Sequence, residues 1–383
     1  MLLAHKIEVR PTPEQAEYLN RACGARRHCF NQLLAHFQQE GVKWSKASAY
    51  QHYMTVLRIE FPWYLETSAR VTRNAIDDLD SAFKHFFRRI KLGQKPGFPR
   101  FKKKGINDSF ALRESGKFAV NGRDLRIEKL KTPLKLRQKL RFTGATKQVT
   151  ISKQAGKFYA SILVETEDYN PHAPADAIVG VDLGIKALAV LSTGEIVPAN
   201  QKLKNNIKKL RRLSRNLSRK TNGSNRRAKA KLKVAKLHAR VANQRQAVIH
   251  VLSDKLTREF KTIVIEDLHV KGMVKNHNLA RAVTDSGFGM LRQAIEYKSQ
   301  LRGGQVILAD RWFPSSKTCS ACGQLHAMPL SQRVMVCDCG NVMDRDVNAA
   351  KNLEQYGRLA LLGDLKRTQE LSKTSSLASA LTA

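Results

Sequence analysis

Residues 178–197, IVGVDLGIKALAVLSTGEIV, constrain the fold more than any other stretch of the chain. An apolar run ends at Asp182, a second one covers 187–191, and a third short one follows Gly194. This pattern predicts three short strands joined by tight turns, with a carboxylate at the end of the first strand. A carboxylate at the rim of a sheet can hold a cation while its neighbours are buried. Because an Asp before a turn is also a common turn residue, the case depends on partner carboxylates.

Two further acids occupy comparable places in the chain. A buried-strand pattern ends at Glu266, and Asp346 stands where the last helical pattern begins. The order of three strands, a helical unit, a strand, a helix, a strand, an insert and a helix predicts that Asp182, Glu266 and Asp346 meet at one edge of a mixed α/β sheet. Three carboxylates in such a place suit Mg²⁺ ions that hydrolyse a phosphodiester. Asp344 and Asp267 are the neighbouring acids most easily confused with Asp346 and Glu266.

The cysteines indicate a metal site rather than a disulfide framework. Four of the six lie within residues 319–339 as two tight pairs, each followed by Gly, which is typical of a zinc ribbon. The second pair has one intervening residue instead of two, and His326 is the alternative ligand. We expect Cys23 and Cys29 to be small buried residues. The expected zinc ligands are Cys319, Cys322, Cys337 and Cys339.

The charge balance points to a polyanionic partner. The chain carries 68 Lys and Arg against 32 Asp and Glu, a formal net charge of +36. Residues 201–250 hold 17 of these cations and no acid, at helical spacing broken at 221–224, which predicts a basic helical hairpin. Nucleic acid is the favoured partner and an anionic membrane the rival. Since the chain has no run of 18 apolar residues and no signal-peptide core, we expect a soluble cytoplasmic protein.

The N-terminal half predicts a second, helical and β-rich region. Residues 2–10 alternate like an edge strand, and helical patterns follow over 14–92. Residues 93–105 combine Gly, Pro, cations and two Phe, which favours a linker that also contacts nucleic acid. Period-two patterns over 108–167, with a hairpin turn at 154–157, predict a small barrel or sandwich into which the helices are inserted.

Three segments lack a clear folded pattern. Residues 168–176 are rich in Pro and polar side chains, and we expect a linker. The connection 271–287 is expected to be mobile. Beyond residue 366 the chain consists largely of Ser, Ala, Leu and Thr, and we expect disorder there.

The segments GVDLGIK, VIEDLHVKGMVKNH, FPSSKTCSACG and DRDVNAAKN resemble those of TnpB, the transposon-associated family of RNA-guided nucleases related to type V CRISPR nucleases. The N-terminal KIEVRPTPEQ and PGFPRFKKK are also similar, so the likeness runs to about residue 360. It implies an α/β RuvC-like (RNase H-type) nuclease domain with a zinc-ribbon insert, and an N-terminal wedge-like β-barrel that carries a helical recognition lobe. The expected domains are the barrel (1–12 and 106–170), the lobe (13–105), the nuclease domain (177–310 and 344–360, with the basic hairpin at 201–260), the zinc ribbon (311–343) and a disordered tail (361–383).

The resemblance also implies an activity. It implies an RNA-guided endonuclease that cuts double-stranded DNA beside a short transposon-adjacent motif, with Asp182, Glu266 and Asp346 holding Mg²⁺, two ions by expectation, and with a structural Zn²⁺. The expected partners are a guide RNA from the transposon end and the target DNA, with no membrane. We further expect a prokaryotic, nucleoid-associated monomer with RNA, genetically associated with a separate transposase. The alternatives are a cleavage-deficient RNA-guided regulator and an RNA-independent RuvC-like resolvase.

Overall fold

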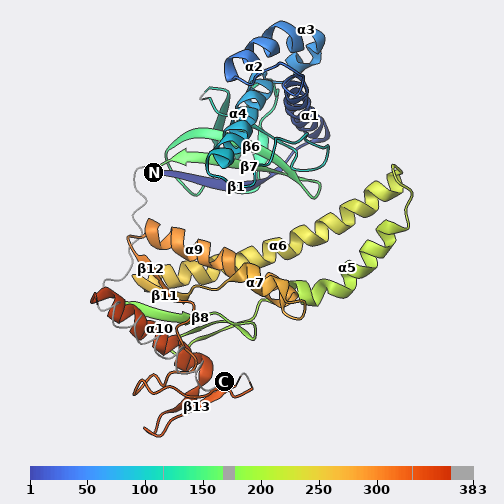
Figure 1. Cartoon of the computed structure of the whole chain (residues 1–383). Helices are drawn as coiled ribbons and strands as arrows, with labels where there is room; N and C mark the ends of the chain where they lie inside the picture. Colours follow the sequence, from blue (N-terminus) through green and yellow to red (C-terminus); the bar gives the residue numbers. More distant parts are fainter. Residues whose placement is uncertain (115, 167–176, 330, 364–383) are drawn as a thin grey trace. The chain divides into compact units, whose positions relative to one another are not determined.

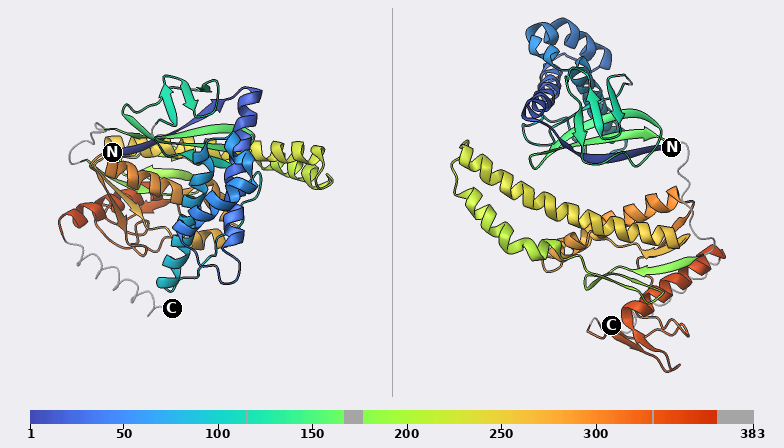
Figure 2. Two further views of the ribbon diagram at one scale, coloured as in Figure 1. Left: turned by 90° about the horizontal axis from the view of Figure 1, so that it is seen from above. Right: turned by 180° about the vertical axis from the view of Figure 1, so that it is seen from behind.

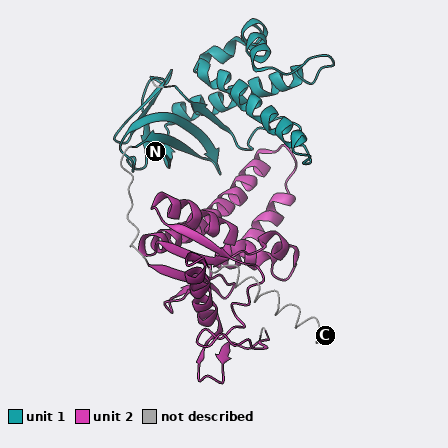
Figure 3. Cartoon of the chain, turned by 60° about the vertical axis from the view of Figure 1, so that its left-hand side comes forward, with its two compact units in different colours: residues 1–169 teal, residues 170–383 magenta. Residues whose placement is uncertain are grey.

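The computed structural model describes residues 1–114, 116–166, 177–329 and 331–363. The chain forms two compact units, Met1–Tyr169 and Asn170–Ala383, and each is described on its own (Figure 3). The expected linker at 168–176 and residues 364–383 of the expected tail lie outside the described residues. None of the described helices is long and apolar enough to cross a bilayer.

The first unit contains a seven-stranded antiparallel sheet in the order β2-β6-β7-β1-β5-β4-β3. The expectation of an N-terminal edge strand is wrong, because β1 lies between β7 and β5. Alternation reports which faces of a strand are buried and says nothing of its neighbours. The hairpin turn at 154–157 is confirmed, with Ala155 and Gly156 both at positive φ. The strands are β1 Leu2–Arg10, β2 Ser109–Leu112, β3 Phe118–Asn121, β4 Asp124–Ile127, β5 Leu134–Leu136, β6 Ala145–Gln154 and β7 Lys157–Glu165.

The helices of this unit share one hydrophobic core with the sheet. Leu33 of α1, Leu79 of α4 and Ile162 of β7 are fully buried members of the same cluster. Cys23 and Cys29 are buried in α1, as the sequence predicts. The helices are α1 Pro13–His36, α2 Lys46–His52, a π-helical turn Tyr53–Leu57, α3 Arg58–Glu60, a 3₁₀ turn Pro62–Glu66 and α4 Ala69–Lys91.

The second unit is built on a five-stranded sheet in the order β10-β9-β8-β11-β12. The three strands predicted within 178–197 are confirmed as antiparallel neighbours, and β11 and β12 continue the sheet in parallel with β8. Helices cover both faces (Figure 1). The strands are β8 Ile178–Asp182, β9 Ala187–Leu191, β10 Ile196–Pro198, β11 Thr262–Glu266 and β12 Gln305–Ala309.

The predicted basic hairpin is formed by α5 (Lys202–Ser218) and α6 (Asn225–Glu259). It extends from the sheet as an arm in Figures 1 and 2, and α5 buries none of its residues. The far end of α6 is different, because Ile249, Leu252 and Leu256 are buried in the core beside β8 and β11. One long helix therefore joins a cationic arm to the sheet.

The remaining elements lie in the second half of this unit. Residues 271–287, expected to be a mobile connection, contain two short helices. The second of these is held in place by Val283, which packs into the core. The last helix ends at Leu361, so the first residue of the expected tail is helical. These elements are α7 Val270–Lys275, α8 Ala280–Ser286, α9 Phe288–Leu301, the hairpin β13 Val334–Val336 and β14 Val342–Asp344, and α10 Arg345–Leu361.

Candidate active site

Two of the predicted acids lie next to each other at the ends of adjacent strands. Strands β8 and β11 are parallel with Val181 opposite Ile265, so the next residues, Asp182 and Glu266, stand at the same edge. Neighbouring strands are about 4.8 Å apart. Alternation along β8 and β11 directs Val181 and Ile265 toward α6 and α9, and Val264 toward α10. Asp182 and Glu266 therefore belong to the α10 face of the sheet.

Helix α10 brings the third acid to this edge. It packs so closely on β8 that a Cβ atom on Gly180 would lie 2.0 Å from the carbonyl oxygen of Ala350. Further along, a Cβ atom on Gly357 would lie 3.0 Å from Ile178 Cδ1, so the helix runs antiparallel to the strand. The four residues from Ala350 back to Asp346 rise about 6 Å, and the two residues from Gly180 to Asp182 rise about 6.6 Å. The first turn of α10 is thus level with Asp182.

The structure distinguishes the two acids at the start of α10. Asp344 is the N-cap, and its Oδ1 accepts hydrogen bonds from the backbone N–H groups of Asp346 (2.8 Å) and Val347 (3.2 Å). The carboxylate of Asp344 is therefore occupied by the helix end. Asp346 lies in the first turn and raises the pKa of Asp182 more than Asp344 does. Both observations favour Asp346 as the third acid of the site.

The pKa of Asp182 responds to both of the other predicted acids. Burial, followed by the charges of Glu266 and Asp346, raises the pKa of Asp182 to about 8, and Arg345 opposes this only in part. Like charges held together in this way favour a bound cation. The donor set, carboxylate oxygens at a sheet edge, is the one that Mg²⁺ prefers.

Glu266 and Asp267 have different partners despite being neighbours. Ser315 Oγ donates to Glu266 Oε1 at 2.6 Å, which fixes the direction of that carboxylate. Asp267 points to the opposite face and is held by Arg292 of α9 and by Arg311, each at 2.6 Å. Asp267 is therefore an ion-pair residue, and Glu266 is the acid that faces α10, as strand alternation predicts.

The four predicted cysteines form a single cluster. Their Sγ atoms all lie within 4.8 Å of one another, with 3.7 Å between Cys319 and Cys339 and 3.5 Å between Cys322 and Cys337. Zn–S bonds of about 2.3 Å in a tetrahedron place sulfurs roughly 3.8 Å apart, so the spacing fits zinc. Among the described residues, this is the one group of candidate ligands gathered so closely, and the three carboxylates are not part of such a group.

The local backbone explains how the short second pair fits. Gly323 and Gly340 follow the two pairs at φ values of 80° and 86°, which allow the chain to turn back under the sulfurs. Burial alone would raise the pKa of Cys319, but the N–H groups of Cys322 and Ala321 and the amide of Asn341 lower it to about 6. His326 does not join the cluster, so the alternative ligand is not needed.

Sequence reasoning missed the residues that join the cysteine segment to α10. Asn352 Nδ2 donates to the carbonyl oxygens of Ser315 (2.7 Å) and Thr318 (2.6 Å). Asn348 accepts from the N–H of Ser320 at 2.9 Å, and Arg345 donates to the carbonyl oxygen of Pro329 at 2.9 Å. Buried Asn and Arg side chains within the helical stretch 344–357 were the available signal, because such polar groups require partners.

Comparison with known proteins gives the family. Residues 161–277 match the OrfB_IS605 family, described as "Probable transposase", and residues 288–353 match the "Cas12f1-like, TNB domain". A protein of Streptomyces pristinaespiralis, named "Putative RNA-guided DNA endonuclease", is 36% identical over 97% of this chain and 94% of its own length. The chain belongs to the TnpB family.

Other members of the family and a solved structure agree. A protein of Escherichia coli (strain K12), named "Putative RNA-guided DNA endonuclease InsQ", is 32% identical over 94% of this chain and 93% of its own length. The structure titled "Cryo-EM structure of the Cas12f1-sgRNA-target DNA complex" has a TM-score of 0.55 and 15% identity, and covers 88% of this chain and 81% of its own. The two chains therefore share a fold. Residues 1–41 match a model described as "Helix-turn-helix domain", although here they form β1 and the single helix α1.

Proposed function

We propose that this chain is an RNA-guided DNA endonuclease that hydrolyses DNA at Asp182, Glu266 and Asp346. One observation carries the proposal: two adjacent parallel strands end in acids on the face that α10 covers, and α10 presents a third acid at the same level. The names of the similar proteins from Streptomyces pristinaespiralis and Escherichia coli support the activity.

The residues around the acids each have a task in this proposal. Mg²⁺ ions held by the three carboxylates would activate a water molecule and stabilise the leaving 3′ oxygen. Ser315 orients Glu266 through its 2.6 Å hydrogen bond. Asp344 keeps Asp346 at the helix N-terminus by capping the helix, where backbone N–H groups favour a negative charge. Burial and the charges of Glu266 and Asp346 disfavour the ionised form of Asp182, so a bound cation would be needed to keep this carboxylate ionised.

The cysteine cluster is proposed to hold a structural Zn²⁺. Four thiolates leave no open coordination position, so this metal has no direct part in hydrolysis. The hydrogen bonds of Asn348, Asn352 and Arg345 tie the segment to the first turns of α10. Zinc would thereby support the helix that carries Asp346.

The remaining parts of the chain are assigned to nucleic acid. We propose that the α5–α6 arm, with 17 cations and no acid over 201–250, holds the guide RNA and the heteroduplex through their phosphates. Sequence choice then comes from base pairing with a guide from the transposon end. In this assignment the first unit is the wedge-like barrel with its recognition lobe, and the protein acts as a monomer beside a transposon-adjacent motif.

The deciding experiment compares Asp182, at the end of β8, with Glu354, an acid of the helix α10 that packs on that strand. The full chain is co-expressed with its flanking DNA, the RNA that co-purifies is sequenced, and a plasmid complementary to that RNA is the substrate. Asp182→Ala is expected to remove cleavage in Mg²⁺ while RNA and target binding remain. Glu354→Gln, on α10 and paired with Arg358, is the matched control and should cut like the wild type.

The outcomes separate the alternatives. If Asp182→Ala cleaves DNA at an unchanged rate, the assignment of the three acids as the catalytic site is wrong. Binding without cleavage by the wild type would indicate an RNA-guided regulator. Sequence-specific cleavage by RNA-free protein would indicate a resolvase.

A further inference from the structure

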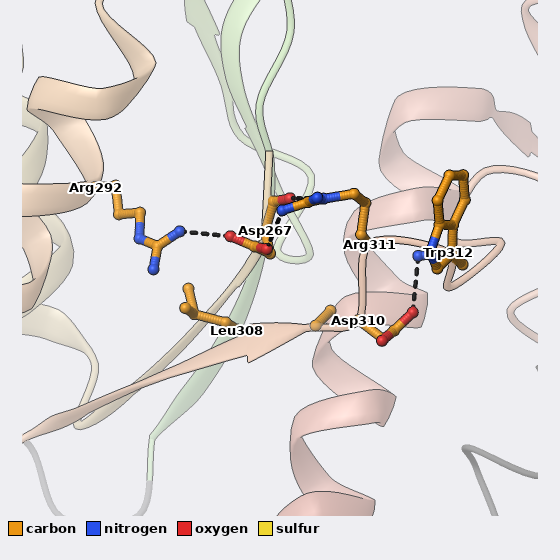
Figure 4. Close-up of a pocket in the computed structure, with 7 residues that line it drawn as sticks. Asp267, Arg292, Leu308, Asp310, Arg311 and Trp312 are labelled. Carbon is orange, nitrogen blue, oxygen red and sulfur yellow. Dashed lines mark hydrogen bonds and ion pairs between the residues drawn. The ribbon is translucent and has the colours of Figure 1, made fainter. Parts of the chain in front are cut away.

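A second feature of the sheet edge is a hollow beside the acids, on the other side of β11. It has a volume of about 480 Å³ and is lined by residues at and just beyond the ends of β11 and β12, together with one from α9 (Figure 4). Its principal residues are Asp267, Arg292, Asp310, Arg311 and Trp312. None of these belongs to the proposed acid site.

Trp312 is the unusual member of this group. The residue is 80% exposed, the largest exposure among the large apolar residues of the described chain. A tryptophan normally buries most of its surface, so an indole left in water calls for a partner. Figure 4 shows the ring turned away from the ion pairs of Asp267.

The loop that carries Trp312 is held in place on both sides. The N–H of Trp312 donates to Asp310 Oδ1 at 2.8 Å, which forms a tight turn after β12. The next residue, Phe313, packs on Tyr356 of α10 with ring centroids 4.9 Å apart. Asn352 of α10 holds the carbonyl oxygen of Ser315 at 2.7 Å. The exposed ring therefore stands on a rigid turn, so little ordering of that turn is needed when a ligand stacks on it.

Two guanidinium groups flank Asp267, and that of Arg311 lies on the side nearer to Trp312 (Figure 4). Asp267 receives Arg292 and Arg311 from opposite sides, as Figure 4 shows, and Arg311 also donates from Nε to the carbonyl oxygen of Asp267 at 3.2 Å. The Arg311 side chain remains 44% exposed although it is fixed in direction. A fixed, exposed guanidinium beside an exposed indole matches a nucleotide, which offers a phosphate and a flat base.

The loop also reaches the acid site. Ser315, three residues after Trp312, hydrogen-bonds Glu266. Three residues span at most about 11 Å, a length covered by roughly three stacked nucleotides at about 3.4 Å each. A strand that leaves the acids along this loop would therefore reach Trp312 within about three nucleotides of its scissile phosphate.

We propose that Trp312 and Arg311 form a positioning site for the DNA strand being cut, in which a base stacks on the indole within about three nucleotides of the scissile phosphate. The inference rests on the proposed nuclease function. Trp312 touches no reacting atom, so it is a positioning residue. Single-stranded DNA is the occupant, because a base in an intact duplex is already stacked on its neighbours and cannot cover the ring.

Photocrosslinking tests the contact without requiring cleavage. The full chain carrying Asp182→Ala, with its co-purified RNA, is mixed with target DNA containing 5-iodouracil at one position at a time near the cut. We expect irradiation to join the DNA to Trp312, identified by mass spectrometry of the peptide spanning 310–315, for positions within about three nucleotides of the cut. Absence of that crosslink at every position would overturn the proposal.

Rates of cutting by the otherwise unchanged chain give the second test. The substitution Trp312→Ala removes the stacking of one base. It should lower the cleavage rate by about 5- to 150-fold when the target DNA is below its saturating concentration. Trp312→Phe should recover most of the rate because it keeps an aromatic face, whereas Trp312→Leu, which is apolar but has no aromatic face, should not. Equal rescue by Leu and Phe would overturn stacking and favour an apolar protein contact.

The two proposals can fail separately. If Asp182→Ala abolishes cleavage but the crosslink falls elsewhere, the acid site stands and the stacking site does not. If Asp182→Ala still cuts, the assignment of the reaction to these three acids is wrong, whatever the crosslinks show.

Discussion

The substitution Gly180→Ala tests the packing that brings the three acids together. A Cβ atom at this position would lie 2.0 Å from the carbonyl oxygen of Ala350 and 2.5 Å from the backbone N of Glu354. Both are backbone atoms, so no side chain can turn aside. Helix α10 must therefore move away from β8, and Asp346 must move with it.

The size of the effect follows from the geometry. Cβ contacts under 3.0 Å essentially do not occur, so the first distance must grow by at least 1.0 Å. Overpacking of this kind costs about 1–3 kcal/mol, which lowers the Tm of a unit of this size by roughly 2–12 °C. A displacement of about 1 Å at a catalytic group costs on the order of 10²-fold in rate. Cleavage is thus expected to fall about 100-fold while the chain remains folded at 25 °C.

The assay combines calorimetry with single-turnover cleavage at saturating guide and target. Gly289→Ala on α9 is the matched control, because its added Cβ meets no atom within 4 Å and replaces Gly in a helix. Gly289→Ala should raise the free energy of unfolding by about 0.5–1 kcal/mol and should cleave DNA at the wild-type rate. If Gly180→Ala matches the wild type in both Tm and rate, the placement of α10 on β8 is wrong, and with it the argument for Asp346.

Two other predictions concern the cysteine cluster and a carboxylate in the first unit. Cys319→Ser should reduce bound zinc from one ion per chain to none by elemental analysis and increase hydrogen exchange over 311–343; one retained zinc would contradict the four-thiolate site. Although burial opposes it, hydrogen bonds from Lys117 and Ser68 lower the pKa of Glu128. The resulting stabilisation is present at neutral pH and disappears as the pH falls below 4.5 through the lowered pKa. In urea unfolding, Glu128→Gln should therefore have a free energy of unfolding about 1–2 kcal/mol lower than the wild type at pH 7, and the difference should shrink in acid. A difference that does not change with pH would refute this.

Much of the second unit could be predicted from local pattern. The apolar runs before Asp182 and Glu266 predict strands because each run is as long as a buried strand and ends in a charged residue. Alternation also predicts that Glu266 and Asp267 face opposite ways, and the structure agrees. Cysteine spacing predicted the cluster because the ligands lie close in sequence.

The rest could not be predicted because it depends on contacts distant in the chain. Ser315 meets Glu266 across 49 residues, and no periodicity marks it. The sequence predicts Asp346 rather than Asp344 as the third acid, but the capping hydrogen bonds that Asp344 accepts, which support this choice, depend on the folded helix end. The position of β1 inside its sheet depends on pairing with β5 and β7, strands more than a hundred residues away. The exposure of Trp312 likewise depends on the turn that packs Phe313 against Tyr356.

Because α10 is the last of the described helices to be synthesised, the proposed acid site is complete only late in translation. Ribosomes add roughly 5–20 residues per second, so about 164 residues and some 8–33 s separate the making of Asp182 from that of Asp346. The cationic arm is made early in this interval, and β12 and the two cysteine pairs follow it before Asp346 is made. Under the proposed function, a growing or stalled chain can grip nucleic acid but cannot cut it. The order of the elements thus protects a cell from a nuclease that is only partly made.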